Sequence, residues 1–499
     1  MAAHTLVQAG KEVLIIDRGK WVVRDDSCWD EIRLHIENPL YRGETPVYAD
    51  QKKGEIEELW PDDTVGGMST FYGAVSLRLR EQDFSGAPVP GSALRDGNSA
   101  WPYGYNEIAP YYGKAEKLLG IAGISGGDIT EPPRESDYLH APGQNLSAPS
   151  SRIWKASTKL GLHPFYLPMA INFSGKYGKG KCISCSTCDH YLCKIEAKND
   201  LSVMILPEIL KKGAVVLSNS RALRINTEGK KAVSVDIIDQ DTCQSVTVKG
   251  KKIIVAGGAL QSPYLLLCSG IGSEERSIVG RYLYRHANGF VAGLFPSKTN
   301  PDLRLQKQIG IADYYYGAHF PSKELPLGVW GMIQDLSSIG KEVVKQNIPK
   351  GFKTIAGFLT DYLINLQCMA EDIPQYNNRV YLDNNRRDKF GMPGLMVFHR
   401  YQKRDIQARK VLYKKARKII LKAGGLPVIS MPFETFSHAM GTCKMGVDKN
   451  TSVVNPECRV WGMDNLYVID ASVMPSGGSV NPSLTIAALS LKASEQLVS

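Results

Sequence analysis

The sequence predicts a mixed α/β fold, α+β overall, that includes a Rossmann-like dinucleotide-binding domain. Three segments indicate this fold, at residues 2–17, 252–268 and 466–486. In each, a short apolar run typical of a buried parallel strand lies beside a glycine, an acidic residue or the start of a helix. At 499 residues, the chain is long enough for two to three domains of roughly 150 residues each.

The N-terminal segment predicts a helix, a glycine stop, a buried strand and a terminal acid. Residues 2–9 form the helix, Gly10 ends it, and residues 12–16 form the strand before Asp17. This is the order of the second half of a βαβ dinucleotide-binding unit, in which the acid accepts hydrogen bonds from a ribose.

The middle of the chain alternates between irregular, helical and strand-like stretches. Pro, Gly and Ser are frequent in residues 86–151, which we expect to be irregular apart from a short helix at 110–119. The predicted helices beyond it cover residues 198–212, 259–268 and 403–423, and the predicted strands cover 214–217, 222–226, 232–238, 245–248 and 252–256. Residues 302–400 alternate strand-like and helix-like stretches.

The net charge of +10 is concentrated in one segment. Residues 403–422 carry nine Lys and Arg side chains against Asp405, so they account for +8 of the total. The rest is nearly neutral, which argues against a nucleic-acid-binding protein. The basic helix is interpreted as a solvated face, and the alternative is a docking site for an acidic electron acceptor or a membrane surface. The sequence contains no apolar run long enough to span a membrane and no visible secretion signal.

The C-terminal segment carries the candidate chemistry. A buried strand at 466–469 ends at Asp470, and Asn481 with Pro482 forms a good N-cap and first turn for the last helix. His438 is a candidate general base, although a lone histidine is more often a packed or surface residue. Arg281 and His286, in a G-R-x4-H stretch, are assigned structural roles.

Five collinear segments resemble the glucose–methanol–choline (GMC) oxidoreductase family of FAD enzymes. They are the glycine-rich stretch 64–74 with Arg78, the W-P-x-x-Y-x-E-x-x-P-Y-Y stretch 101–112, the strand and turn 253–263, the S-H-A-M-G-T stretch 437–446, and the paired stretches 465–472 and 481–486. The resemblance implies a discontinuous FAD domain from residues 1–80, 200–300 and 437–499. It also implies a substrate domain from 81–199 and 301–436, with an antiparallel sheet and flanking helices.

The resemblance also implies the site residues. His438 matches the family's base, and Asn481 matches the partner that hydrogen-bonds the substrate hydroxyl; Asn cannot take a proton at neutral pH, so His438 carries that role. The implied FAD-binding residues are Asp17, Arg18, Gly66, Gly67, Met68, Ser69, Thr70, Tyr72, Gly73, Ala74, Ala222, Ala256, Gly257, Asp470, Ala471, Asn481, Pro482 and Thr485. Phe71 stands where relatives with covalent flavin carry a histidine, so we expect non-covalent FAD.

The family's N-terminal strand and G-x-G-x-x-G turn have no counterpart in this sequence. Three explanations are open: a true start upstream of Met1, weak FAD binding, or none. We favour the upstream start, because the other flavin contacts keep the family pattern. A cytoplasmic location is slightly favoured.

Four cysteines form a cluster with the spacing C-x2-C-x2-C-x4-C, at Cys182, Cys185, Cys188 and Cys193. Three interpretations stay open: ligands of an iron–sulfur cluster, a four-thiolate zinc site, or a structural loop of reduced or disulfide-bonded cysteines. Ten cysteines in the whole chain are too few for a disulfide scaffold.

The leading functional hypothesis is FAD-dependent oxidation of a sugar or polyol hydroxyl, with oxygen or another electron acceptor taking the electrons. Oxidation of a non-sugar alcohol is the alternative within the enzyme class. A flavin-deficient scaffold subunit is the alternative outside it.

Overall fold

The computed structural model describes residues 1–498 apart from 38, 51–54, 86–98, 144, 273–276, 317–328, 338–339, 347–348, 350, 352 and 434. The α-helices are α1 Ala2–Gln8, α2 Glu31–His35, α3 Glu81–Phe84, α4 Tyr105–Leu118, α5 Ala148–Thr158, α6 Leu201–Met204, α7 Leu206–Lys211, α8 Gly258–Cys268, α9 Lys341–Gln346, α10 Lys353–Leu359, α11 Lys403–Lys422 and α12 Ser483–Val498. Short 3-10 helices are η1 Asp26–Trp29, η3 Gly67–Thr70, η7 Thr360–Tyr362 and η8 Ala471–Val473.

The strands form five sheets in the described part of the chain. Their bounds are β1 Leu14–Ile16, β2 Val47–Asp50, β3 Ile56–Leu59, β4 Pro164–Tyr166, β5 Val215–Leu217, β6 Ser220–Glu228, β7 Lys231–Asp239, β8 Ser245–Lys249, β9 Ile253–Val255, β10 Ala287–Leu294, β11 Ile309–Ile311, β12 Gly331–Leu336, β13 Leu363–Ala370, β14 Arg379–Arg387, β15 Pro393–Phe398, β16 Leu426–Pro432 and β17 Leu466–Val468.

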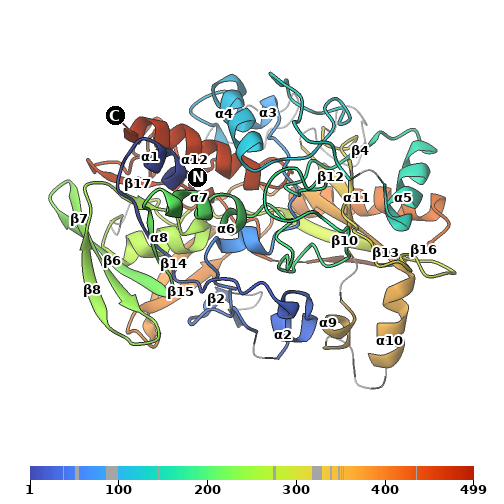
Figure 1. Ribbon diagram of the computed structural model, residues 1–499, viewed down its shortest axis with the longest axis horizontal. Helices are drawn as coiled ribbons and strands as arrows, with labels where there is room; N and C mark the ends of the chain where they lie inside the picture. Colours follow the sequence, from blue (N-terminus) through green and yellow to red (C-terminus); the bar gives the residue numbers. More distant parts are fainter. Residues whose placement is uncertain are drawn as a thin grey trace.

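A six-stranded antiparallel sheet fills one half of the molecule, in the order β16-β10-β13-β12-β11-β4 (Figure 1). The basic helix α11 covers one face of it through Leu412, Ala416 and Ile419, which are fully buried against residues of β10 and β13. Because side chains alternate between the two faces of a strand, the other face of this sheet is turned toward the rest of the molecule.

The opposite half holds two parallel strand pairs, β1 with β5 and β9 with β17. Helices α1, α4 and α12 lie side by side above them, and both chain ends lie in this half (Figure 1). A three-stranded antiparallel sheet, β6-β7-β8, and a four-stranded sheet, β14-β15-β2-β3, complete the arrangement. The expected combination of parallel strand pairs and a large antiparallel sheet is therefore present.

The structure corrects two predicted helices. The predicted helix 198–212 is two short helices, α6 and α7. Asp200 caps the start of α6. Pro207, in the first turn of α7, has no backbone N–H with which to continue the helical hydrogen bonds from α6. The helix predicted at 110–119 begins earlier, at Tyr105, since the Glu107 carboxylate accepts a hydrogen bond from the Gly104 N–H at its start. Part of the predicted irregular stretch, residues 86–98, lies outside the described residues.

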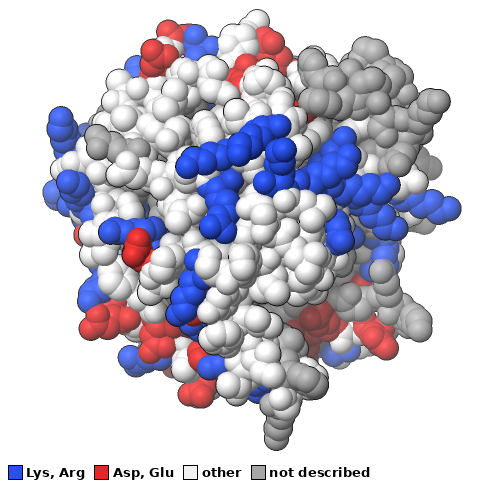
Figure 2. All heavy atoms as spheres, turned by 90° about the vertical axis from the view of Figure 1, so that its right-hand side faces the viewer, with Lys and Arg blue, Asp and Glu red and all other residues white. Residues whose placement is uncertain are grey.

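The basic face of α11 is only partly solvated. Lys410, Lys414, Arg417, Lys418 and Lys422 are exposed, whereas Arg404 and Arg409 are buried. Figure 2 shows Lys and Arg side chains gathered across the face that holds the outer end of the large sheet. None of the described helices is both long and apolar enough to cross a membrane.

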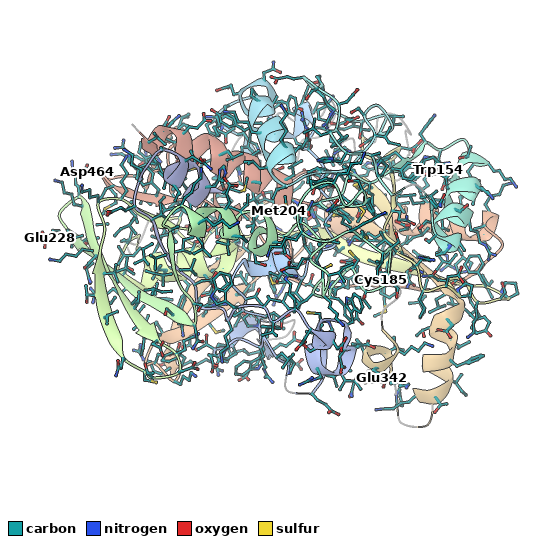
Figure 3. All side chains as sticks on the ribbon, viewed as in Figure 1. Trp154, Cys185, Met204, Glu228, Glu342 and Asp464 are labelled. Carbon is teal, nitrogen blue, oxygen red and sulfur yellow. The ribbon has the colours of Figure 1, made fainter. Side chains whose placement is uncertain are left out.

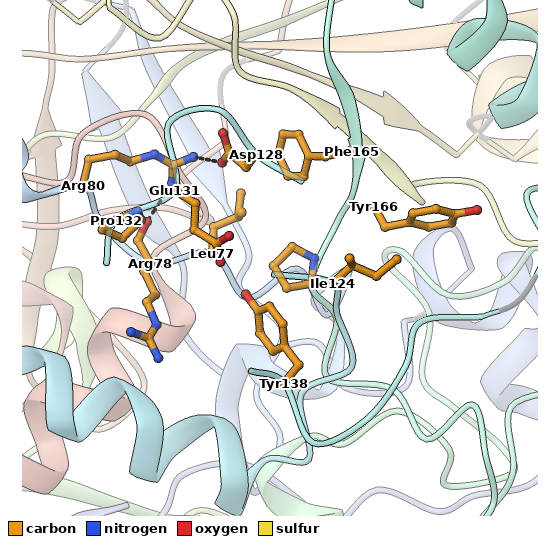
Figure 4. A pocket seen from close by; sticks show the side chains of 11 residues that line it. Leu77, Arg78, Arg80, Ile124, Asp128, Glu131, Pro132, Tyr138, Phe165 and Tyr166 are labelled. Carbon is orange, nitrogen blue, oxygen red and sulfur yellow. Dashed lines mark hydrogen bonds and ion pairs between the residues drawn. The ribbon is translucent and has the colours of Figure 1, made fainter. Parts of the chain in front are cut away.

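Two buried arginines fix the chain beyond the glycine-rich stretch. The Arg78 guanidinium donates to both Glu116 carboxylate oxygens at 2.8 Å, and Arg80 pairs with Asp128. Figure 4 shows Arg80 and Asp128 along one side of a small pocket. Its interior is about 10 Å³, roughly the space of one water molecule. This pocket is a crevice between ion pairs and is too small for an organic substrate.

Removal of the Arg78 charge should destabilise the fold. Arg78→Met leaves the Glu116 carboxylate with one cationic partner fewer in a buried site, so we expect a loss of about 3 kcal/mol in the free energy of unfolding, measured by urea denaturation. Lys114→Ala is the matched control, because the Lys114–Glu495 pair is 52% and 41% exposed, and it should cost less than about 1 kcal/mol. Equal losses from both variants would contradict this account.

Candidate functional site

His438 and His286 are in contact at the junction of the two halves. Their Nδ1 atoms are 2.9 Å apart, and their rings meet edge to face. The cause is a short antiparallel bridge between Tyr284 and Met440, in which each N–H donates to the other's carbonyl. In an antiparallel pair, the residue two places after one bridge partner faces the residue two places before the other. This pairing therefore places His286 against His438.

Burial lowers the pKa of both imidazoles. The pKa of His286 falls to about 4, and that of His438 falls well below its ordinary value, with His286 and Lys307 adding to the effect. The backbone of Gly477 and Gly478 favours a proton on His286 and so raises its pKa in part. Neither backbone group is placed well enough to form a full hydrogen bond with His286 Nε2. Both rings are therefore neutral at pH 7. His438 keeps partial exposure to solvent, whereas His286 is buried.

Asn481 is held from the large sheet. Gln334, on β12, donates from Nε2 to the Asn481 carbonyl oxygen at 2.8 Å, and both residues are buried. The chain segment just before Asn481 is also held in place. Tyr315 Oη accepts a hydrogen bond from the Ser479 N–H at 3.0 Å and donates one to the Asp83 carboxylate at 2.8 Å. Within the part of the chain that the structure describes, the Asn481 side-chain N–H groups donate to no other group, which leaves them available.

The glycine-rich stretch folds back on itself beside the end of β1. Gly66 and Gly67 adopt positive φ values of 104° and 60°, which favour glycine. A side chain at Gly67 would meet no atom within 4 Å. Asp17, directly after β1, accepts from the Gly19 N–H at 2.8 Å. Burial raises the pKa of its carboxyl, while Gly19 and Gly66 oppose that shift. The sequence-predicted strand-end acid and glycine loop therefore come together.

A second group lies at the ends of β9 and β17. The Asp470 carboxylate accepts from the Gly258 N–H at 2.8 Å, from the Ser472 N–H at 2.7 Å and from the Ser262 hydroxyl. Gly258 begins α8 with φ 76° and has no neighbour where a Cβ would stand. Asp17 follows the carboxyl end of β1, which pairs in parallel with β5, while Gly257 and Asp470 follow β9 and β17, which pair in parallel with each other. Open α/β sheets bind nucleotides at such strand ends.

The remaining predicted cofactor residues occupy neighbouring segments. Met68 is half exposed, Ser69 and Thr70 bond back to the carbonyls of Gly66 and Gly67, and Arg18 pairs with Asp63. Two of the other predicted cofactor residues make side-chain hydrogen bonds within the protein: Tyr72 Oη donates to the Asn199 carbonyl at 3.1 Å, and the Thr485 hydroxyl bonds to the Tyr112 hydroxyl at 2.8 Å. The rest are small residues or proline, with no polar side-chain group to offer: Gly73, Ala74, Ala222, Ala256, Ala471 and Pro482.

The four clustered cysteines, of which Cys185 is labelled in Figure 3, lie in a loop bonded to the glycine-rich stretch. Buried Lys198 donates from Nζ to the carbonyls of Tyr72, Cys188 and Tyr191, and the His190 N–H donates to the Phe71 carbonyl at 3.0 Å. All ten cysteines are free thiols, which excludes the disulfide variant of the loop in this structure. No three Cys, His, Asp or Glu side chains among the described residues surround a point where one metal ion would sit.

A buried ion pair lies between this loop and the site. Lys307 Nζ is 2.7 Å from the Asp189 carboxylate, and a Cβ at Gly73 would approach both groups within 3 Å. Burial alone would raise the pKa of Asp189, but Lys307 and His190 outweigh it and lower the value to about 2. Lys307 has φ 68°, an unfavourable conformation for a non-glycine residue. The pair's field reaches His438.

The sequence did not indicate three residues as neighbours of the site. His286, for which we predicted a structural role, contacts His438; the G-R-x4-H stretch is the signal that could have marked it. Gln334 and Lys307 lie in stretches with no motif: Gln334 is positioned by the pairing of β12 with β13, and Lys307 by its ion pair with Asp189.

Comparisons with known proteins agree on one family. Models of the N- and C-terminal parts of GMC oxidoreductases match residues 59–288 and 374–490. Paromamine 6'-oxidase of Streptomyces fradiae is 30% identical over 99% of this chain and 88% of its own. Fructose dehydrogenase large subunit of Gluconobacter japonicus is 25% identical over 100% and 95%. The crystal structure of pyridoxine 4-oxidase from Mesorbium loti has a TM-score of 0.69 at 18% identity, covering 99% of this chain and 96% of that one.

The contacting histidines His286 and His438 should make stability depend on pH. Because folded-state pKa values lie below the ordinary value of about 6.5, the unfolded chain binds protons that the folded chain excludes. Stability is therefore complete above about pH 6.5 and falls as the pH drops toward 4. We expect His286→Asn to reduce the loss of unfolding free energy between pH 6.5 and pH 4 by about 2–3 kcal/mol. The melting temperature should therefore depend less steeply on pH. An unchanged slope would show that His286 is already protonated in the folded state.

Proposed function

The chain belongs to the GMC oxidoreductase family of FAD-dependent enzymes, and on that premise we propose that it oxidises a hydroxyl group of a sugar or other polyol with His438 as the base. The observation that carries this proposal is the contact of His438 with His286. Named relatives act on such compounds: paromamine, gluconate and fructose.

The tautomers of the two histidines determine which nitrogen acts. The backbone of Gly477 and Gly478 favours a proton on His286, so we place that proton on Nε2. His286 Nδ1 then accepts the hydrogen bond from His438 Nδ1–H. This leaves the lone pair on His438 Nε2, which accepts the substrate's hydroxyl proton. The lowered pKa keeps His438 unprotonated at pH 7.

Asn481 orients the same hydroxyl. Its carbonyl oxygen is taken by Gln334, so its side-chain N–H groups face the substrate and donate to the hydroxyl oxygen. Base and donor together hold the oxygen while its proton leaves.

When bound, FAD would supply the acceptor for the hydride of the carbinol carbon. The residues that would hold it follow β1, β9 and β17, together with the glycine-rich stretch; the open space at Gly67 and Gly258 fits close approach of a ligand to the backbone. Phe71 is packed against Tyr41 and offers no nucleophile, which supports a dissociable cofactor. Oxygen or another electron acceptor would then take up the electrons.

The base role predicts a large loss of activity. His438→Gln should lower the rate of anaerobic flavin reduction by a polyol about 10²–10⁴-fold, while His286→Asn should cost less. The rate in the native protein should stay constant as the pH falls through 6.5, since His438 is already unprotonated. Stopped-flow absorbance of the flavin measures both.

His163→Asn is the control, because that side chain is 61% exposed and should leave the rate unchanged. A His438→Gln enzyme with the native rate would refute the proposal, and flavin content must be equal in all variants.

We further propose that the cysteine loop holds a polynuclear iron–sulfur cluster. Backbone or hydroxyl groups hydrogen-bond three of the four sulfurs: Ser184 N–H to Cys182, Thr187 Oγ1 to Cys185, and Ala197 N–H to Cys193, at 3.3–3.4 Å. Such bonds tune iron–sulfur centres.

Mutual proximity of the thiols supports the same proposal. Burial raises the pKa of Cys188, and the other three thiols add to that rise. A bound cluster would supply one-electron redox chemistry beside the flavin loop.

Metal analysis tests this second proposal. Protein prepared without oxygen should contain iron and acid-labile sulfide in several equivalents per chain, and Cys188→Ser should lose them. Cys243→Ser is the matched control, because Cys243 is exposed and lies outside the cluster. Zinc in place of iron, or neither metal, would overturn the proposal.

A further inference from the structure

A buried ion pair, Lys307 with Asp189, joins three segments of the chain beside the site. Lys307 lies just before β11, Asp189 lies in the loop of the four clustered cysteines, and their side chains are only 8% and 4% exposed. Both groups lie against Gly73 of the glycine-rich stretch, because a Cβ added there would stand 2.7 Å from Asp189 Oδ1 and 2.9 Å from Lys307 Nζ. We call Lys307 and Asp189 the inner ion pair.

The inner ion pair is unfavourable for the fold in two ways. Lys307 adopts φ 68°, a left-handed conformation that residues other than glycine seldom take. Both charges are also withdrawn from water, and buried ion pairs can often be replaced by apolar side chains without loss of stability. Strained backbone persists where the surrounding structure enforces it, and it is concentrated at functional positions.

The surrounding structure does enforce the position of Lys307, from both sides along the chain. On one side, the Leu305 N–H donates to the Ser184 carbonyl in the cysteine loop at 2.8 Å. On the other, the Gln308 carbonyl accepts from the Leu167 N–H at 2.9 Å. Lys307 is therefore held between two fixed points, and its ammonium group is directed at the glycine-rich stretch.

Other contacts already fasten the cysteine loop to the glycine-rich stretch. The His190 N–H donates to a backbone carbonyl of that stretch at 3.0 Å, and Lys198 Nζ donates to the carbonyls of both Tyr72 and Cys188. The residues on either side of Asp189 are thus bound without the ion pair. Anchoring of the loop therefore does not account for two buried charges.

The charges lie where they would act on a bound flavin. Gly73 is among the residues implied to hold FAD, and a flavin gains negative charge when it is reduced. A fixed cation in a buried site stabilises charge that develops nearby far more than it would in water. Both charges also act on His438, whose pKa Lys307 lowers and Asp189 raises, with Lys307 the stronger. The two charges therefore do not cancel at the site.

We propose that Lys307 tunes the reduction of the bound flavin: its positive charge, held against Gly73 by Asp189, favours the reduced cofactor, and Asp189 limits that gain. This inference rests on the proposed FAD-dependent oxidation and adds to it a pair of residues that sets the flavin's reduction potential. The hydride still passes from the carbinol carbon to the flavin and the hydroxyl proton to His438. The inner ion pair itself exchanges no atom and no electron.

The potential of the FAD-loaded protein tests this role, measured from flavin absorbance during equilibration with a reference dye. Lys307→Met should lower the equilibrium constant for flavin reduction about ten-fold, or about 30 mV for a two-electron couple. Asp189→Asn, which removes the opposing charge, should shift it the other way. Lys389→Met is the control, because the Lys389–Glu44 pair is 46% and 35% exposed, and it should leave the potential unchanged.

The opposite signs separate a charge effect from a loosened fold, which would move both variants in the same direction. A fall of the potential in Lys307→Met without a fall in Asp189→Asn supports the proposal. No fall in Lys307→Met, or a fall in both variants, overturns it.

The double variant Lys307→Met/Asp189→Asn replaces the single ones if a lone buried charge prevents folding. Its potential should lie below that of the native protein, since Lys307 is the stronger charge at the site; a native or higher value overturns the proposal. Shifted potentials in a protein whose flavin no alcohol reduces would refute the proposed oxidation and leave this inference standing. A protein that takes up no FAD would refute both.

Discussion

The alternation of side chains on the three central strands of the large sheet is the constraint on which the site depends. One face of β10, β13 and β12 is sealed by the apolar stripe of α11. With that face filled, every second residue must point the other way. That requirement places Gln334 beneath Asn481 and aligns three more carboxamides with it. A shift of one residue in register would move these amides under α11 and remove the support of Asn481.

The catalytic pair depends on a second pairing, between segments more than 150 positions apart in the sequence. The Tyr284–Met440 bridge sets His286 against His438, and the same segment continues directly into β10. His286 therefore directly precedes a strand of the large sheet, and the bridge between Tyr284 and Met440 ties the segment of His438 to that sheet. The residues that follow β1, β9 and β17, among them Asp17 and Asp470, are those we propose for the cofactor.

Much of the fold could be predicted from the sequence, because local signals specified it. The runs at 252–256 and 466–469, the β6–β8 meander and the apolar stripe of α11 all appear where periodicity placed them. Motifs also indicated His438 and Asn481. The sequence could not indicate His286 as a partner or Gln334 as a support, since both roles require knowing which strands pair and in what register. Arg404 and Arg409 were expected on a solvated face, yet tertiary packing buries them.

The most direct test of the account is anaerobic flavin reduction by a sugar or polyol that carries deuterium on the carbinol carbon, compared with the unlabelled compound. If His438 Nε2 takes the hydroxyl proton while the carbinol hydride moves to the flavin, the flavin-loaded protein should lose its visible flavin absorbance, and deuterium should slow that loss several-fold. Bleaching at the same rate with both compounds would show that breaking this C–H bond does not limit the step. No bleaching at all would contradict alcohol oxidation by this site.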